Sequence, residues 1–352
     1  MTVYIVDIEP VETRYTAQWK NHLPSLIEGA VVIEGAEDIP KATTPGAFLN
    51  FGGTNVYKAR QIETMGRLFC DGSIKKGDHF LFTDAWHPGI INLKYMSELL
   101  KIPVKIHGLW HAGSYDPQDF LGRMIGDAGW VRHAEKSFYY AINRNYFATD
   151  FHIQMFGQNL LNWRQQLCPA NYNAYNIVRS GWPMEYMEET LKPYKGLKKR
   201  NLIVFPHRIA PEKQVEIFRD LAKRNPQYEW IVCQDQTLTK DQYHTLLGEA
   251  KIVFSCSLQE TLGIGCYEGC IVDAIPFVPD RLSYKEMYND ALRYPCEWTF
   301  NYDSYLQNRG LLESKINVLM ENYDQWKELC VPQTHTLTKH FFSATKILEN
   351  LK

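Results

Sequence analysis

Residues 251–280, KIVFSCSLQETLGIGCYEGCIVDAIPFVPD, decide the fold of this chain. Short apolar runs at 251–257 and 275–280 predict two buried strands, and the segment between them, 263–274, predicts a helix. A strand that is apolar along its whole length is typical of a parallel sheet covered on both faces. The stretch therefore predicts a strand–helix–strand unit of an α/β domain.

The same alternation continues on both sides of this stretch. Strands are predicted at 201–206 and 228–234, and helices at 211–225, 240–250 and 283–294. The first half of the chain alternates less regularly, with strands expected at 3–8, 30–35, 47–53, 78–85 and 103–113 and helices at 12–28, 55–69 and 90–100. Repeated strand–helix alternation predicts two doubly wound, Rossmann-like parallel-sheet domains.

A chain of 352 residues is longer than one hydrophobic core usually organises. Residues 186–200, YMEETLKPYKGLKKR, have the composition of a linker and precede the first strand of the second half. We therefore predict a first domain at 1–190, a second at 191–332, and a C-terminal helix at 333–352 that packs back on the first domain.

Composition restricts the class of protein. The formal net charge is −2, which argues against a surface devoted to a polyanion. The sequence contains neither a long apolar run nor a signal-like N-terminus, so we expect a soluble, cytoplasmic protein that does not insert into membranes. Cys266 and Cys270 are four residues apart, but nearby partners for a zinc site are lacking, so they are interpreted as packing residues and no metal is expected.

One candidate site lies in the deciding stretch. Glu260, Gly263 and Gly265 follow a strand, and Glu268 lies on the helix that comes next. Glycines at such a turn let backbone amides approach an anion, and the helix N-terminus adds partial positive charge. A diphosphate is therefore expected here, with the carboxylates accepting hydrogen bonds from sugar and ribose hydroxyls.

A second segment carries cations to the same edge of the sheet. In FPHRIAPEKQ, His207 and Arg208 follow a strand, and Lys213 comes five residues after Arg208 at the predicted start of a helix. Two cations that converge on one diphosphate stabilise it as a leaving group.

Together these motifs resemble those of the retaining glycosyltransferases of the GT-B fold, especially the large family four. That family carries two glutamates separated by seven residues, matched by Glu260 and Glu268, preceded by an Arg and a Lys five apart, matched by Arg208 and Lys213. The resemblance implies that Arg208 and Lys213 bind the diphosphate, Glu260 the sugar and Glu268 the ribose of a nucleotide-diphosphate sugar. The amides implied for the distal phosphate are those of Thr261, Leu262, Gly263 and Ile264. The resemblance also implies two domains facing a cleft, no metal or other cofactor, and retention at the anomeric carbon, with a UDP-sugar favoured.

In the first half, Gly52 and Gly53 resemble the glycine-rich loop that many GT-B enzymes place near the donor phosphate. Family members often present a histidine to the donor sugar, and His111 is the residue predicted for that role.

Two predicted strand ends also gather titratable side chains. These are Asp84 and His87 after one strand and His107, His111 and Asp116 around the next. Such clusters mark functional sites, and Asp84 and His87 are predicted acceptor contacts.

The predicted acceptor is a hydroxymethylated base in phage DNA, because the chain resembles in size and type the stand-alone phage glycosyltransferases that decorate such bases. The basic candidates for duplex DNA are Arg123, Arg132, His133 and Lys136, predicted on one helix. The aromatic candidates for stacking an extruded base are Trp86, Trp110 and Tyr115. A glycan, lipid or protein acceptor stays open, as do a sugar-nucleotide epimerase and a protein that only binds a nucleotide sugar or nucleic acid.

Overall fold

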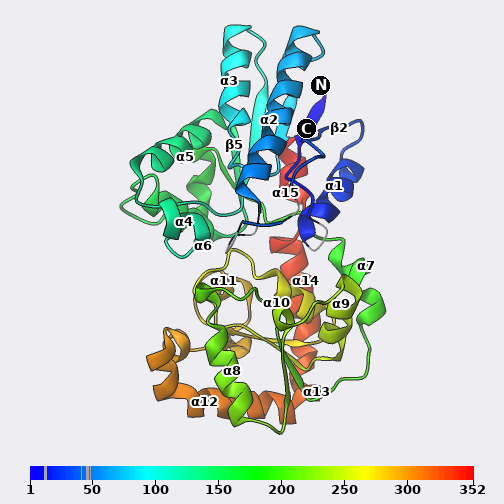
Figure 1. The fold of residues 1–352 in the computed structure, drawn as a ribbon, viewed down its shortest axis with the longest axis vertical. Coiled ribbons are helices and arrows are strands. Elements are labelled where there is room, and N and C mark those ends of the chain that lie inside the picture. The colour runs from blue at the N-terminus through cyan, green and yellow to red at the C-terminus, as the bar shows by residue number, and fades with distance from the viewer. Residues whose placement is uncertain (12–13, 41, 45–46, 48) are drawn as a thin grey trace. The chain divides into compact units, whose positions relative to one another are not determined.

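The computed structural model describes residues 1–11, 14–40, 42–44, 47 and 49–352, and the chain divides into two units (Figure 1). The first unit comprises Met1–Pro183 and Ala344–Lys352, and the second comprises Met184–Ser343. The observed first unit ends its main segment at Pro183, seven residues before the predicted boundary at 190. Only the last nine residues return to the first unit, whereas the sequence predicted that all of 333–352 would do so.

A parallel sheet of six strands forms the centre of the first unit. In spatial order the strands are β2 (Val31–Ile33), β1 (Val3–Val6), β3 (His79–Phe82), β4 (Lys105–Trp110), β5 (Arg144–Phe147) and β6 (Ile177–Arg179). The chain leaves β1 for β2 on one side and then reaches β3 on the other. The gap between β1 and β3 is therefore the topological switch point, where ligands of open α/β sheets bind beyond the carboxyl ends.

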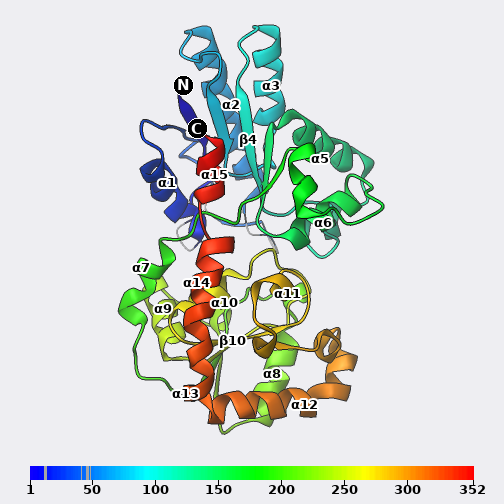
Figure 2. The same ribbon diagram turned by 180° about the vertical axis from the view of Figure 1, so that it is seen from behind.

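Helices surround this sheet (Figures 1 and 2). They are α1 (Tyr15–Leu26), α2 (Phe51–Cys70), α3 (Gly89–Leu99), α4 (Phe120–Ile125), α5 (Gly129–Ala141), α6 (Asp150–Asn159), a 3₁₀ turn η1 (Pro169–Tyr175) and α15 (Thr345–Asn350). Large apolar side chains such as Phe80, Phe82 and Phe156 are fully buried between the layers. Burial of this apolar surface is the main force that holds the helices on the sheet.

The second unit contains a parallel sheet of five strands. In spatial order they are β11 (Arg293–Tyr294), β10 (Ile275–Pro279), β9 (Ile252–Phe254), β7 (Leu202–Phe205) and β8 (Glu229–Val232). Here the chain passes from β7 to β8 on one side and later to β9 on the other, so the switch point lies between β7 and β9. The residues that follow these two strands are the candidates singled out in the sequence.

The helices of the second unit are short apart from α12. They are α7 (Met187–Leu191), α8 (Val215–Arg224), α9 (Lys240–Glu249), α10 (Ile264–Ile271), α11 (Tyr284–Met287), α12 (Tyr302–Glu321), α13 (Tyr323–Trp326) and α14 (Cys330–Phe341), with 3₁₀ turns η2 (Lys192–Tyr194), η3 (Pro211–Lys213), η4 (Cys233–Asp235), η5 (Asp290–Leu292), η6 (Cys296–Thr299) and η7 (Lys327–Leu329). Among the described residues, no helix combines the length and the apolar character that crossing a bilayer requires.

The two predicted doubly wound sheets are confirmed, but some local predictions are wrong. The segment 47–53, predicted as a strand, contains none in its described residues, and Gly52 and Gly53 lie in the first turn of α2, which Asn50 caps by accepting a hydrogen bond from the Gly53 amide at 2.7 Å. The predicted single basic helix is two helices, α4 and α5. Residues 12–13 of the predicted first helix, and residue 48, lie outside the described residues.

Candidate functional site

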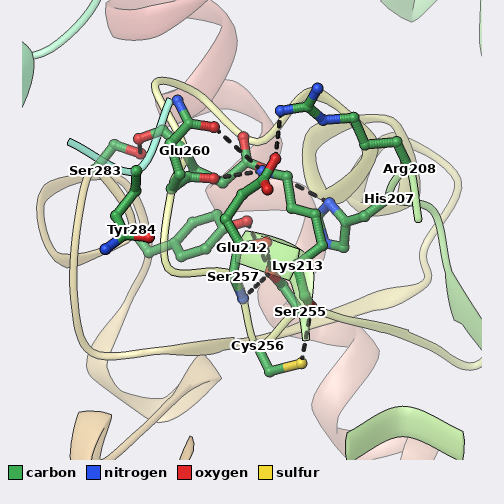
Figure 3. A network of polar contacts seen from close by, with 12 residues as sticks. His207, Arg208, Glu212, Lys213, Ser255, Cys256, Ser257, Glu260, Ser283 and Tyr284 are labelled. Carbon is green, nitrogen blue, oxygen red and sulfur yellow. Dashed lines mark hydrogen bonds and ion pairs between the residues drawn. The ribbon is translucent and has the colours of Figure 1, made fainter. Parts of the chain in front are cut away.

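A cluster of charged side chains lies beyond the carboxyl ends of β7 and β9, at the switch point of the second unit (Figure 3). His207 and Arg208 follow β7, and the segment from Ser255 to Glu260 follows β9. Lys213 comes from the turn η3. The structure therefore brings together residues that are about fifty positions apart in the sequence.

Lys213 and Glu260 form the centre of this cluster. The Lys213 Nζ lies 2.7 Å from Glu260 Oε1 and also donates to the carbonyl oxygen of Gln259. The Lys213 and Glu260 side chains are only 6% and 14% exposed. A buried pair with so little contact with water interacts more strongly than a surface pair, because solvent screens it less.

The position of Lys213 depends on Gln214, which the sequence placed inside a helix. Gln214 has a φ of +54°, in the left-handed region, so the turn η3 ends there and α8 begins only at Val215. Its side chain holds this conformation by donating to the carbonyl oxygens of Cys256 at 2.6 Å and Thr299 at 2.9 Å. Lys213 is thereby fixed beside the end of β9 and not at a helix start.

His207 is a third member of the cluster. Its Nδ1 lies 3.3 Å from Glu260 Oε1, and its buried Nε2 has no hydrogen-bond partner among the described residues. Burial lowers the pKa of His207 despite the opposing effect of the Glu260 carboxylate, so the ring is neutral near pH 7. A neutral ring that donates from Nδ1 presents Nε2 as an acceptor.

The charge state of Glu260 follows from these neighbours. Burial by itself raises the pKa of the carboxyl group. The Lys213 ammonium and the hydrogen bond from His207 lower it by more than burial raises it, so the pKa lies well below its usual range. Both contacts are made by Oε1. Oε2 makes none with the described residues, and it is available to accept a hydrogen bond from a ligand hydroxyl.

Arg208 lies at the rim of the cluster and pairs with Glu212. The Arg208 Nη2 donates to Glu212 Oε1, and the Glu212 side chain is fully buried whereas that of Arg208 is 26% exposed. A guanidinium has five donors in a planar fork, so one ion pair leaves others for an anion. Glu212 thus orients Arg208 towards the same edge of the sheet (Figure 3).

The turn between Glu260 and α10 requires glycine at position 263. Gly263 has a φ of +64° at the N-cap of α10, and an added Cβ would lie 2.6 Å from Tyr284 Cε1. A Cβ at Gly265 would lie 2.8 Å from Pro206 Cβ. The first amides of a helix have no intrahelical acceptor, so this turn offers N–H donors and partial positive charge next to the Lys213–Glu260 pair.

Replacing Gly263 by alanine is expected to lower the free energy of unfolding by about 2–4 kcal/mol, because a left-handed φ and a close contact with Tyr284 are both imposed. Gly310 is the matched control, since it lies inside α12 with open space around its Cα. Gly310→Ala is expected to stabilise by about 0.5–1 kcal/mol. Urea titration of both variants checks the prediction, and equal effects of the two substitutions would contradict it.

Glu268, on the second turn of α10, is held by Tyr243 of α9. The Tyr243 hydroxyl donates to Glu268 Oε2 at 2.7 Å, and it would lie 3.3 Å from a Cβ at Gly265. Burial raises the pKa of Glu268 to about 7, although the hydrogen bond from Tyr243 and the charge of Lys240 act in the opposite direction. Glu268 therefore lies beside the glycine turn and titrates near neutral pH.

In the first unit, Asp84 and His87 follow β3, as the sequence predicted. Asp84 forms a buried ion pair with Lys58 of α2 at 2.8 Å, and the same ammonium donates to the carbonyl oxygen of Trp86. His87 Nδ1 accepts from the Gly89 amide and Nε2 lies 2.9 Å from Gln61 Oε1. Burial lowers the pKa of His87 to about 3, so this ring is neutral and accepts from the first amide of α3.

His111 follows β4 and lies in an aromatic surround. Its Nε2 lies 2.6 Å from the carbonyl oxygen of Thr83, and its Nδ1 lies 2.8 Å from the hydroxyl of Tyr15. Burial lowers the pKa of His111, against the effect of the Asp84 carboxylate. Trp182 packs on the ring with centroids 4.6 Å apart.

Several other candidates of the first unit lie elsewhere than the sequence suggested. His107 is inside β4, two residues from its start, and is not at a strand end. Trp110 and Tyr115 are each 1% exposed, and Phe156 packs against both rings, so neither presents a face to a base in this structure. Trp86 is only partly buried, and its indole donates to Glu135.

The basic candidates make contacts within the unit. Arg132 donates to the carbonyl oxygens of Gly126 and Asn159, and Arg123 donates to that of Gln118. Asp116 is buried and accepts from the Gln118 amide. His133 and Lys136 lie on α5.

Four residues of these networks were missed by the sequence as site members: Glu212, Gln214 and Tyr243 in the second unit, and Lys58 in the first. Each is a single polar residue on a helix or turn, with no local motif that distinguishes it from a solvated one. The position of His207 after a predicted strand indicated a site residue, but nothing in the sequence indicated its contact with Glu260.

No family model and no curated protein matches this sequence. Among solved structures, the chain is similar to sucrose-phosphate synthase from Thermosynechococcus elongatus, with a TM-score of 0.60, 9% identity, and 99% of this chain and 97% of that chain covered. Anabaena HepE in complex with UDP and glucose gives a TM-score of 0.58 at 11% identity, covering 99% of this chain and 98% of that one. Staphylococcus aureus TarM gives 0.54 at 14% identity over 83% of this chain, which spans only 58% of the TarM chain. These likenesses confirm the predicted GT-B fold.

Proposed function

We propose that this chain is a glycosyltransferase that moves a sugar from a nucleotide-diphosphate sugar, with a UDP-sugar favoured, to an acceptor hydroxyl. The observation that carries the proposal is the buried Lys213–Glu260 pair next to the Gly263 turn, at the switch point of the second sheet. The ligands bound in similar structures support it, because HepE was solved with UDP and glucose and a starch synthase with ADP.

In this proposal, each group has one task. Lys213, Arg208 and the amides of Thr261–Ile264 hold the diphosphate and stabilise its negative charge as the glycosidic bond breaks. Glu260 is ionised and offers Oε2 to a sugar hydroxyl, while Glu268 accepts from the ribose.

The proposed outcome at the anomeric carbon is retention, by the resemblance to family four. The acceptor hydroxyl attacks the face that the phosphate leaves, and the departing phosphate oxygen takes the acceptor proton. The protein supplies orientation and exclusion of water, not a nucleophile. His111 is proposed to contact the donor sugar, and Gly52 and Gly53 the donor phosphate.

The acceptor proposed from the sequence is a hydroxymethylated base in duplex DNA. The experiment incubates the protein with a panel of radiolabelled nucleotide sugars and offers hydroxymethylated DNA, unmodified DNA or a small glycan. Label in hydroxymethylated DNA alone supports this acceptor, and label in the glycan alone replaces it. Rearrangement of donor incubated alone would indicate an epimerase, and saturable donor binding with no turnover would contradict a transferase.

Donor binding is expected to depend on pH through Glu268. As its pKa is about 7 in the ligand-free protein, raising the pH from 6 to 8 converts the carboxyl into the acceptor-only carboxylate that paired ribose hydroxyls require. The dissociation constant of an intact UDP-sugar should therefore fall roughly tenfold over this range. Isothermal titration calorimetry measures it, and an intact sugar nucleotide avoids the titration of a terminal phosphate.

Glu268→Gln is expected to bind more weakly and without this pH dependence, whereas Glu216→Gln, an exposed glutamate on α8, should behave as the wild type. A stability measurement shows that the variant is folded. A carboxyl whose pKa is higher in the folded protein than in the unfolded chain favours the folded state below its unfolded pKa, and this contribution is lost as the pH rises through 7. Above pH 7 the free energy of unfolding of Glu268→Gln should therefore exceed that of the wild type by up to about 3 kcal/mol. A pH-independent affinity in the wild type would exclude Glu268 from the ribose site.

A further inference from the structure

A second concave site lies in the first unit, at the edge of the sheet opposite to its carboxyl ends. A cavity of about 400 Å³ is lined by residues at the start of neighbouring strands and by the C-terminal segment. Lys105 is the first residue of β4, Arg144 is the first of β5, and Asn176 immediately precedes β6. Figure 2 shows α15 along this part of the unit. The cavity is therefore distinct from the strand ends that carry Asp84 and His111.

The lining of this cavity is basic. Lys105 and Arg144 contribute two positive charges, and Glu349 contributes one negative charge. The Glu349 carboxylate already pairs with Lys346 at 2.7 Å, which reduces its repulsion of an anion. The whole chain has a formal charge of −2, so this concentration of cations is local.

Arg144 is held across the cavity without a carboxylate partner among the described residues. Its Nε lies 3.3 Å from Asn350 Oδ1, and its Nη1 lies 3.2 Å from Asn176 Oδ1. Both distances are long for a charged donor, which makes shorter contacts to an anion. The two side-chain amides thus orient the guanidinium, which can still form shorter, charge-assisted hydrogen bonds with a phosphate or carboxylate.

His107 provides an uncharged polar group in the same lining. It is 1% exposed, its Nδ1 lies 2.8 Å from the Tyr146 hydroxyl, and its Nε2 has no partner among the described residues. Burial lowers the pKa of His107 to about 3, with the positive charges of Arg144 and Lys105 acting in the same direction. The Nε2 atom is itself closed to solvent, so the ring forms a neutral part of the cavity wall.

We propose that this cavity binds the phosphate monoester of a small polyhydroxylated molecule, with Arg144 and Lys105 on the phosphate. The volume falls in the range of small-molecule sites, roughly 300–1,000 Å³. The lining combines cations for the phosphate with Glu349 and Asn176 for hydroxyl groups. Cations grouped in a concave site that also contains a carboxylate fit a compact phosphate ester better than a long polyanion such as DNA.

In the test, the full chain is titrated by calorimetry with glucose 6-phosphate. Separate titrations use glucose and inorganic phosphate, the two components of that ester. We expect glucose 6-phosphate to bind, inorganic phosphate to bind more weakly and glucose not to bind. Arg144→Gln should weaken glucose 6-phosphate by at least about tenfold, as the loss of a charge-assisted hydrogen bond predicts. Lys105→Gln should weaken it by a smaller factor and covers the case in which Arg144→Gln does not fold.

Arg67→Gln is the matched control, because Arg67 is an exposed arginine paired with Glu63 on α2. It should leave the affinity for glucose 6-phosphate unchanged, and none of the three variants should alter binding of a UDP-sugar. Equal binding of glucose and glucose 6-phosphate would overturn the proposal, as would wild-type affinity in both cavity variants. Binding of duplex DNA that is lost in Arg144→Gln, with no binding of glucose 6-phosphate, would assign the site to a nucleic-acid backbone instead.

Discussion

Lys213→Met is expected to lower the rate of sugar transfer by roughly 10²–10³-fold, the usual effect of removing one fixed donor from developing negative charge. Methionine keeps most of the volume of lysine, so the packing of η3 against the end of β9 is retained. The ammonium of Lys213 lies in a site almost closed to water, where its interaction with a departing diphosphate is little screened. Single-turnover rates with a radiolabelled UDP-sugar and a competent acceptor measure the loss.

Lys213→Met also leaves the Glu260 carboxylate buried without its main partner, which costs about 3–5 kcal/mol of stability when one member of a buried pair is removed. A loss of activity alone is therefore ambiguous. Lys213→Met combined with Glu260→Gln is expected to recover much of the stability and none of the turnover. Lys223→Met, an exposed lysine on α8, is the control for substitution as such. Transfer near the wild-type rate in folded Lys213→Met would exclude this residue from the donor site.

The fold was predictable because each strand and helix is marked by the spacing of apolar residues within its own segment. The runs around residues 201–206, 251–257 and 275–280 are buried along their whole length in β7, β9 and β10, as the apolar composition required. The alternation of these strands with helices leaves few topologies, and the switch point between β7 and β9 follows from them.

The centre of the candidate cluster was predictable for the same reason. Residues that follow neighbouring parallel strands meet at one edge of the sheet, which brings Lys213 to Glu260. The partners were not predictable. Glu212 lies one position from Lys213 but points to Arg208, and Gln214 breaks the expected helix because two carbonyl oxygens outside its segment bind its side chain. Such choices depend on residues far away in the sequence.

The first unit shows the limit most clearly. Trp110, Tyr115 and His107 are polar-tipped rings near a predicted strand end, and composition alone does not distinguish a binding surface from a core. The structure places all three in buried networks, with partners such as Asn145 and Tyr146 on the next strand. Nothing local in the sequence pairs Asp84 with Lys58, because they are 26 positions apart and meet only where α2 packs against the end of β3.

Lys58→Met is expected to destabilise the protein by about 3–5 kcal/mol, since it leaves Asp84 charged and nearly buried, with the side chains of the pair only 8% and 14% exposed. The double variant Lys58→Met with Asp84→Asn removes both charges and is expected to be more stable than Lys58→Met alone. Urea titrations of the wild type, the two single variants and the double variant complete the thermodynamic cycle.

The pH dependence identifies the charge as the cause. Burial alone raises the pKa of Asp84, but Lys58 and the neighbouring His111 lower it to about 2, below the ordinary value of 3.8. The stability that this depression contributes is present above pH 4 and is lost as the pH falls towards 2, so the difference between the wild type and Asp84→Asn should shrink over that range. Lys94, which pairs with Glu98 on the surface of α3, is the control, and Lys94→Met should cost no more than about 0.5 kcal/mol. Equal costs at Lys58 and Lys94, or a double variant no more stable than Lys58→Met, would show that the Asp84 pair does not hold α2 to the end of β3.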